Sequence, residues 1–98
     1  MSQIQAAGWF CYKDENQYNE LKSIFTDAHK LPVTFSRWKE LTDKGIHEAE
    51  SGGMVIVRAY AESTDEFVSF CRHHGKSLSA EGRKHFANFK AAEYLRRR

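Results

Sequence analysis

Residues 54–61 read Met-Val-Ile-Val-Arg-Ala-Tyr-Ala, and this stretch decides the fold. Its run of β-branched side chains is typical of a strand. Turn-forming Gly52-Gly53 precedes it and polar Glu62-Ser63 follows it, so the strand is short and bounded on both sides. We expect it to lie beside a second strand.

The second strand is predicted near the N-terminus, where residues 5–13 read Gln-Ala-Ala-Gly-Trp-Phe-Cys-Tyr-Lys. This segment is short, rich in aromatic residues and followed by the polar residues 14–16. Gly8 inside it indicates either a bulge or a place where another backbone approaches closely.

Two helices are predicted between the strands, because apolar residues there recur at spacings of three and four. Asp14 can cap the first helix, which ends before Pro32 since the residue before a proline disfavours helical dihedrals. Thr34 or Ser36 offers the N-cap of the second helix. That helix ends at residues 51–53, Ser-Gly-Gly, which suit a turn.

Two further helices are predicted after the second strand. Ser63 and Glu66 fit a capping box at the start of the third helix, and Gly75 closes it. The fourth helix starts at Ala80 and runs through Leu95 into a triple arginine, whose cations suit the negative end of the helix dipole.

The order β-α-α-β-α-α predicts an α+β fold with a minimal sheet of two or three strands. A length of 98 residues allows one hydrophobic core, so we expect a single domain over residues 1–98, with residues 95–98 as a frayed basic tail. A bare two-stranded sheet is marginal. Three alternatives therefore remain: helices cover it, a third strand near residues 30–35 completes it, or a second copy extends it.

Charge is distributed unevenly along the chain, although the net charge is only +2. Residues 72–98 carry eight basic and two acidic groups, whereas residues 1–71 carry seven basic and eleven acidic groups. A basic end on an acidic body indicates an anionic partner or a complementary protein surface.

The predicted fourth helix carries a basic stripe, because Arg83, Lys90 and Arg97 recur every seven residues. Lys76 and Arg96 extend it, and such a stripe suits phosphate contacts with nucleic acid. A solvated helix face is the alternative interpretation. A DNA-reading helix-turn-helix around Gly75 matches only in part, since residues 81 and 84, which would pack inward, are charged.

The same helix is apolar on two sides, which is typical of a helix between its own core and a partner. Phe86 and Phe89 occupy one side. The other side forms a candidate interface, in a homo-oligomer or with a protein partner, that comprises Ala87, Ala91, Tyr94 and Leu95.

No catalytic or metal-binding constellation emerges from the sequence. Cys71, His73, His74 and His85 are potential zinc ligands, but their spacing matches no finger or metalloprotease. Acidic pairs lie at helix starts, where carboxylates favour the dipole. We therefore expect no cofactor, no metal and no enzyme, and free thiols at both cysteines.

No apolar run approaches the roughly 20 residues that span a bilayer, and the N-terminus lacks a secretory pattern. We expect a cytoplasmic protein without a membrane association. The leading functional hypothesis is a small non-enzymatic protein-interaction module that self-associates. Nucleic-acid binding through the basic C-terminal helix is the alternative.

Overall fold

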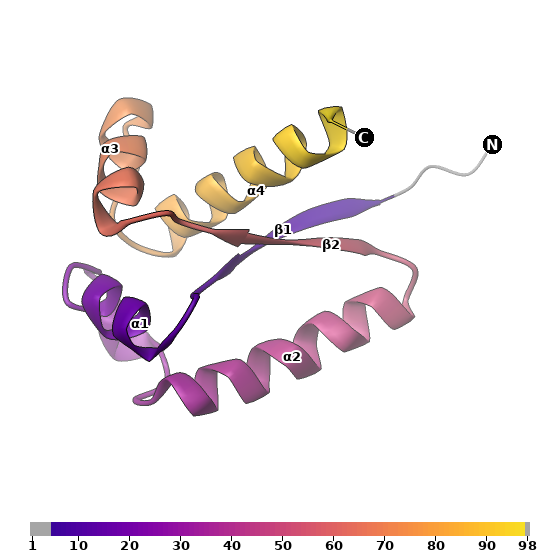
Figure 1. The fold of residues 1–98 in the computed structure, drawn as a ribbon, viewed down its shortest axis with the longest axis horizontal. Helices are drawn as coiled ribbons and strands as arrows, with labels where there is room; N and C mark the ends of the chain where they lie inside the picture. Colours follow the sequence, from indigo (N-terminus) through magenta and orange to yellow (C-terminus); the bar gives the residue numbers. More distant parts are fainter. Residues whose placement is uncertain (1–4, 98) are drawn as a thin grey trace.

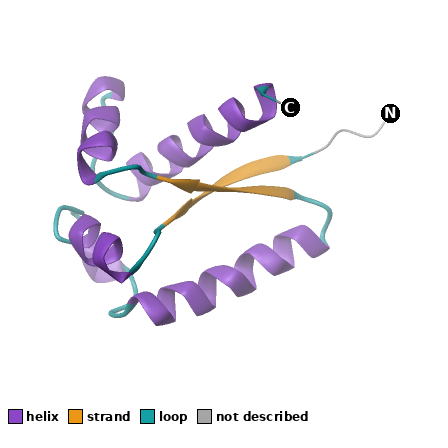
Figure 2. Cartoon of the chain, in the orientation of Figure 1, coloured by secondary structure: helices purple, strands orange, loops and turns teal. Residues whose placement is uncertain are grey.

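The computed structural model describes residues 5–97, and their elements follow the expected order (Figures 1 and 2). A short 3₁₀ turn, Ala28–Lys30, separates the first two helices, so the segment near residues 30–35 supplies no third strand. The α+β fold is otherwise as the sequence predicts. The elements are β1 (Ala6–Cys11), α1 (Glu15–Lys22), α2 (Phe35–Ser51), β2 (Val55–Tyr60), α3 (Thr64–His74) and α4 (Ala80–Arg96).

Strands β1 and β2 pair in parallel, with Ala6 opposite Val55 and Cys11 opposite Tyr60. Parallel pairing needs a long crossover, which α1 and α2 provide. Within residues 5–97 the sheet has only these two strands. Figure 1 shows how it is stabilised: α4 lies across one face and α2 lies along the other, while α1 and α3 gather at the carboxyl ends of the strands.

The face of the sheet that packs against α4 depends on Gly8. A Cβ atom at this position would lie 2.0 Å from the carbonyl oxygen of Ala87 on α4. The backbones of β1 and α4 therefore approach too closely for any other residue. Of the two predictions made for Gly8, the close approach is confirmed.

The opposite face packs against α2. The Trp9 ring lies so close to α2 that a Cβ atom on Gly45 would meet it at 2.9 Å. On the neighbouring strand, Arg58 forms an ion pair with Asp43 of α2 at 3.4 Å. Tyr60, at the end of this face, is exposed.

The core is built mainly from aromatic rings in edge-to-face contact, the geometry that their quadrupoles favour. Phe10 of β1 is central, because its ring centroid lies 5.1 Å from that of Phe67 on α3 and 5.4 Å from that of Phe86 on α4. A second group joins it through Tyr12, whose ring centroid is 4.8 Å from that of Trp38. Aromatic contacts thus connect β1 and the residue after it to α2, α3 and α4.

The helix starts follow the capping chemistry of the sequence. Asp14 accepts a hydrogen bond from the Gln17 amide, and Thr34 accepts one from the Arg37 amide. Ser63 accepts from the Glu66 amide at 3.1 Å. The Glu66 carboxylate reaches back one residue further than a standard capping box and accepts from the amide of residue 62 at 2.7 Å.

The helix ends are partly as predicted. Gly75 closes α3 with a φ of 64°, in the left-handed region that favours glycine. Helix α4 continues through Leu95 to Arg96, so these two residues belong to the helix and not to a tail. No helix within residues 5–97 is long and apolar enough to cross a membrane.

Candidate functional site

The first residue of the predicted basic stripe, Arg83, lies inside an ion pair. Its two terminal nitrogens donate to the two carboxylate oxygens of Asp27 at 2.9 and 2.8 Å, and each side chain is only 12% exposed. The Ala80 amide at the start of α4 also donates to Asp27, at 3.0 Å. Hydrogen bonding from Arg83 lowers the pKa of Asp27 below its ordinary value. The ion pair between Arg83 and Asp27 therefore holds α4 against the loop after α1.

The second residue of the stripe, Lys90, is also paired. Its ammonium lies 3.1 Å from the Glu66 carboxylate on α3 and 5.3 Å from the centre of the Phe86 ring. Arg97, the third residue, lies 4.0 Å from Glu93 and remains 82% exposed. Of the three residues of the stripe, Arg97 alone is exposed, and it lies at the C-terminal end of α4.

The two remaining predicted contacts lie apart from each other. Lys76 is half-buried in the turn between α3 and α4, beside Cys71 and Arg72. Arg96 is exposed in the last turn of α4. The structure therefore does not join the five predicted cations into one surface.

The four residues of the candidate interface divide between core and surface. Ala87 and Ala91 are 1% and 5% exposed and belong to the chain's own core. Tyr94 and Leu95 are 52% and 38% exposed, and Phe89, expected in the core, is also exposed. Ala87 packs inward at the point where the backbones of α4 and β1 meet, since a Cβ atom on Gly8 would lie 2.0 Å from the Ala87 carbonyl oxygen.

Tyr94 lies beside an edge of the sheet that pairs with no further strand within residues 5–97. The Val55 amide donates to the Gln5 carbonyl, so the peptide groups of Val55 and of alternate residues after it point toward β1. The peptide groups of Ile56, Arg58 and Tyr60 consequently point outward. We call this side of the strand the β2 edge; residues 55–58 and Tyr94 line a hollow of about 290 Å³ there.

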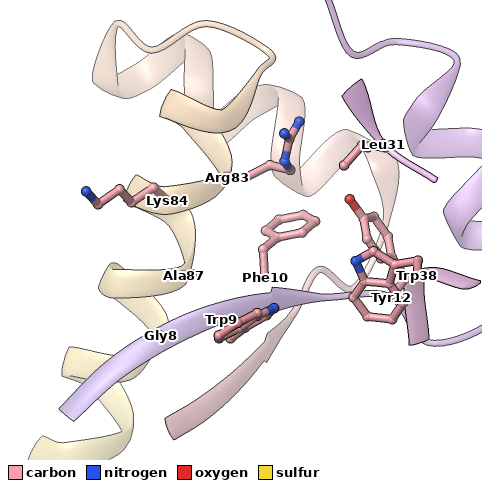
Figure 3. A pocket seen from close by; sticks show the side chains of 9 residues that line it. All are labelled: Gly8, Trp9, Phe10, Tyr12, Leu31, Trp38, Arg83, Lys84 and Ala87. Atoms are coloured by element: carbon pink, nitrogen blue, oxygen red, sulfur yellow. The ribbon is translucent and has the colours of Figure 1, made fainter. Parts of the chain in front are cut away.

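The opposite edge of the sheet belongs to β1 and is partly occupied. The Gly8 amide donates to the side-chain oxygen of Asn88 on α4 at 3.3 Å. Next to this bond is a hollow of about 280 Å³, the β1-edge hollow (Figure 3). The side chains that characterise it are Trp9, Tyr12, Leu31, Trp38, Arg83 and Lys84.

Tyr12 is the unusual group in the β1-edge hollow. Its side chain is almost completely buried, with 4% exposure, and no buried polar side-chain atom within residues 5–97 is left without a hydrogen-bond partner. The neighbouring Tyr18 donates its hydroxyl to the Pro32 carbonyl. Figure 3 shows the Tyr12 hydroxyl pointing toward Leu31. Burial raises the pKa of Tyr12 far above its ordinary value, so the hydroxyl stays protonated.

Three histidines gather between α3 and α4. The ring centroids of His73 and His74 are 5.1 Å apart, and those of His74 and His85 are 5.0 Å apart. Desolvation and then the neighbouring His85 lower the pKa of His74. Within residues 5–97 no group of three His, Cys, Asp or Glu residues is placed to hold a metal ion.

Cys71 lies under the contact between α3 and α4. A Cβ atom on Gly82 would meet its sulfur at 2.7 Å and the Ser77 carbonyl oxygen at 2.2 Å. Gly82 therefore sets the distance between the two helices. Burial raises the pKa of the Cys71 thiol, and the charge of Glu81 adds to this shift.

The helix-turn-helix alignment does not describe how α3 and α4 pack. Glu81 and Lys84, the residues at its inward positions, are both exposed. The Glu81 carboxylate instead accepts a hydrogen bond from the Ser77 amide at 3.1 Å. The charges at these two positions are therefore solvated and need no buried partner.

Comparisons with protein-family models, with curated proteins and with solved structures found no match to this chain.

Two features of the candidate sites have no signal in the sequence. Asp27 and Arg83 are 56 positions apart, and the β1-edge hollow draws residues from β1, α2, α4 and the loop before α2.

Proposed function

We propose that the chain is a small non-enzymatic protein-interaction module that self-associates through the β2 edge. The observation that carries this proposal is the row of outward peptide groups at Ile56, Arg58 and Tyr60. An unpaired strand edge is a template for another strand. Two copies related by a twofold axis would join their β2 strands and form one four-stranded sheet, which is more stable than two strands alone.

The charge of Arg58 selects the register of this pairing. Antiparallel strands pair through residues whose peptide groups point to the partner. If the twofold axis of the dimer passed beside Arg58, the Arg58 residues of the two copies would lie directly opposite each other, and their like charges would destabilise the pairing. If the axis passes beside Val57, Arg58 lies opposite Ile56 of the second copy. We propose this register.

Apolar side chains flank the β2 edge and support its burial. Val55 and Val57 are half-buried on the α4 side, and Tyr94 covers the hollow next to them. Leu95 is exposed one residue further along α4. In a dimer these side chains would be buried together with the strand edge. Burial of apolar surface would stabilise the dimer by about 25 cal/mol per Å².

Nucleic-acid binding is the second candidate function, and the structure offers it less support. Arg83 and Lys90 are engaged by Asp27 and Glu66. The exposed cations that remain at the end of α4 include Arg96 and Arg97. A salt-sensitive complex with nucleic acid in solution would support this candidate instead.

The test is the solution mass, measured by light scattering on a size-exclusion column at low and high salt. We expect a salt-resistant dimer at tens of micromolar. Tyr94→Glu should dissociate it, because the added carboxylate would be buried beside β2, whereas Leu41→Glu on α2 should not; both positions are exposed apolar residues. Ile56→Pro removes one outward amide without touching the β1–β2 bonds, and it should also yield a monomer.

Three results would contradict the proposal. The wild-type chain could be monomeric at every concentration tested, or Leu41→Glu could dissociate the dimer as well as Tyr94→Glu. In the third result, the chain elutes as a monomer with material that absorbs at 260 nm and that salt removes. Loss of this material in a variant with Arg96→Glu and Arg97→Glu would favour nucleic-acid binding instead.

A further inference from the structure

We propose that Asn88 protects the β1 edge, the side of β1 that faces away from β2, against the addition of another strand. The chain then accepts a partner strand only at the β2 edge, and its assembly stops at a dimer. The number of copies rests on the proposed function, whereas the protection of β1 does not.

The β1 edge has three outward peptide groups. The Gln5 carbonyl accepts from the Val55 amide, so the peptide groups of Gln5 and of alternate residues after it point toward β2. The peptide groups of Ala6, Gly8 and Phe10 consequently point away from β2. A further strand would pair with these three residues, because an unpaired strand edge is a template for another strand.

Asn88 occupies the middle one of the three groups. Its side-chain oxygen accepts a hydrogen bond from the Gly8 amide at 3.3 Å. An arriving strand would need the same amide, since strand pairing uses every second residue of an edge. Asn88 is exposed and lies inside α4, where asparagine is a weaker helix former than alanine. Neither the core nor the helix requires an asparagine here, so we assign its role to the strand edge.

The short distance between α4 and β1 brings Asn88 within reach of the edge. A Cβ atom on Gly8 would lie 2.0 Å from the carbonyl oxygen of Ala87, the residue before Asn88. Figure 3 shows Gly8 and Ala87 on neighbouring ribbons. At the β2 edge, in contrast, the nearby residue of α4 is Tyr94, which lines a hollow beside the strand.

The protection of β1 determines how far the assembly grows. Two copies that join their β2 strands form a four-stranded sheet, and each outer strand of this sheet is a β1. If the outer edges were free, dimers would join through them and the sheet would grow without closing. Asn88 protects both outer edges, so growth stops at two copies.

The test is the solution mass of Asn88→Ala over a range of concentrations, because alanine favours the helix and lacks the acceptor. We expect assemblies that are larger than the wild type and grow with concentration. In dilute solution, where β1 edges do not meet, the Gly8 amide should exchange its hydrogen about fivefold faster, the value of one hydrogen bond. Asn88→Asp keeps an oxygen acceptor and should retain the wild-type mass. Asn19→Ala, at an exposed asparagine of α1, is the control.

Two further changes locate the new contact. Ala6→Pro removes the outward amide of the first residue of β1, a position where proline is tolerated. Added to Asn88→Ala, it should restore the wild-type mass. Tyr94→Glu, which should prevent pairing through β2, leaves the β1 edge unchanged. Added to Asn88→Ala, it should give a dimer joined through β1.

The proposal is wrong if Asn88→Ala keeps the wild-type mass, if Asn88→Asp or Asn19→Ala assembles to the same extent, or if Ala6→Pro fails to restore the wild-type mass. A monomeric wild type would contradict the proposed function alone. In that case Asn88→Ala should still convert the monomer into a dimer joined through β1, so the two failures are distinguishable.

Discussion

The carboxylate of Asp27 and the guanidinium of Arg83 form a two-pronged ion pair, although 56 positions separate them in the chain. Asp27 follows α1, and Arg83 lies in the first turn of α4. The pair joins the first and last helices beside the aromatic core, because the Arg83 guanidinium also lies 4.6 Å from the centre of the Phe25 ring.

Loss of either partner should destabilise the protein by about 3 kcal/mol, since the other charge stays largely buried without a counter-ion. We expect this loss for Arg83→Ala and for Asp27→Ala in urea unfolding. The double variant should cost less than the sum of the two changes. Arg37→Ala is the control, because Arg37 and Glu40 form an exposed pair that contributes about 0.5 kcal/mol or less.

The same pair should make stability depend on pH in the acid range. The pKa of Asp27 is lower in the folded protein than its ordinary value of 3.8. The contribution is therefore fully present above pH 3.8 and is lost as the pH falls through the folded pKa. Urea unfolding between pH 2 and 6 should show a steeper loss for the wild type than for Asp27→Asn. Parallel curves would contradict this prediction.

Replacement of Gly82 by alanine should destabilise the protein by about 3 kcal/mol, because the new methyl group would overlap the Ser77 carbonyl and the Cys71 sulfur. The sign of this change in stability is informative, since Gly→Ala inside an ordinary helix stabilises a protein by about 1 kcal/mol. Gly52→Ala is the control, because its nearest new contact is 3.5 Å. A Gly82→Ala protein as stable as the wild type would show that α3 and α4 can separate without cost.

Acidification should weaken the contact between α3 and α4 through His74. Desolvation and the nearby His85 lower the pKa of His74 from 6.5 in the folded protein, so the unfolded chain binds the proton more readily. The contribution of neutral His74 to the free energy of unfolding is therefore fully present above pH 6.5, and it decreases as the pH falls toward the pKa of His74 in the folded protein. His74→Gln should flatten the dependence of the unfolding free energy between pH 5 and 7, and His47→Gln on α2 should leave it unchanged.

Both thiols should react slowly while the protein is folded. Burial raises the pKa of Cys11 to about 11, so about a thousandth of this thiol is ionised at pH 8. Cys71 is buried and its pKa is raised as well. A chromogenic disulfide at pH 8 should report the two thiols only as urea unfolds the chain. A thiol that reacts within seconds in native buffer would contradict the burial.

The element order was predictable because the local signals agree with the final fold. Asp14 and Ser63 cap the helices that they were expected to cap, and Gly75 ends α3 in a left-handed conformation. These features depend on a few neighbouring residues, so the sequence alone contains them. The two strands were recognisable for the same reason.

The orientation of α4 was not predictable from its pattern. Apolar residues occur on nearly all sides of this helix, so periodicity does not identify the buried face. The decisive factor is the approach of Ala87 to Gly8, a contact between residues 79 positions apart. The sequence pattern therefore predicts Ala87 and Ala91 at an interface, and this prediction is wrong because both residues lie in the core.

The candidate sites could not be predicted from the sequence for a similar reason. Arg83 and Lys90 lie on one stripe in the helical pattern, but their carboxylate partners, Asp27 and Glu66, come from other helices and loops. Charge counting along a single helix therefore overestimates the cations that remain for a ligand.

The parallel pairing of Ala6 with Val55 determines when the chain can fold during synthesis. The two residues are 49 positions apart, and β1 has no hydrogen-bonding strand until β2 has left the ribosome. Bringing such distant segments together costs loop entropy before any contact compensates for it. The aromatic residues of β1 remain exposed during that interval, so translation speed through residues 12–60 sets how long a newly made chain is open to aggregation or to a chaperone.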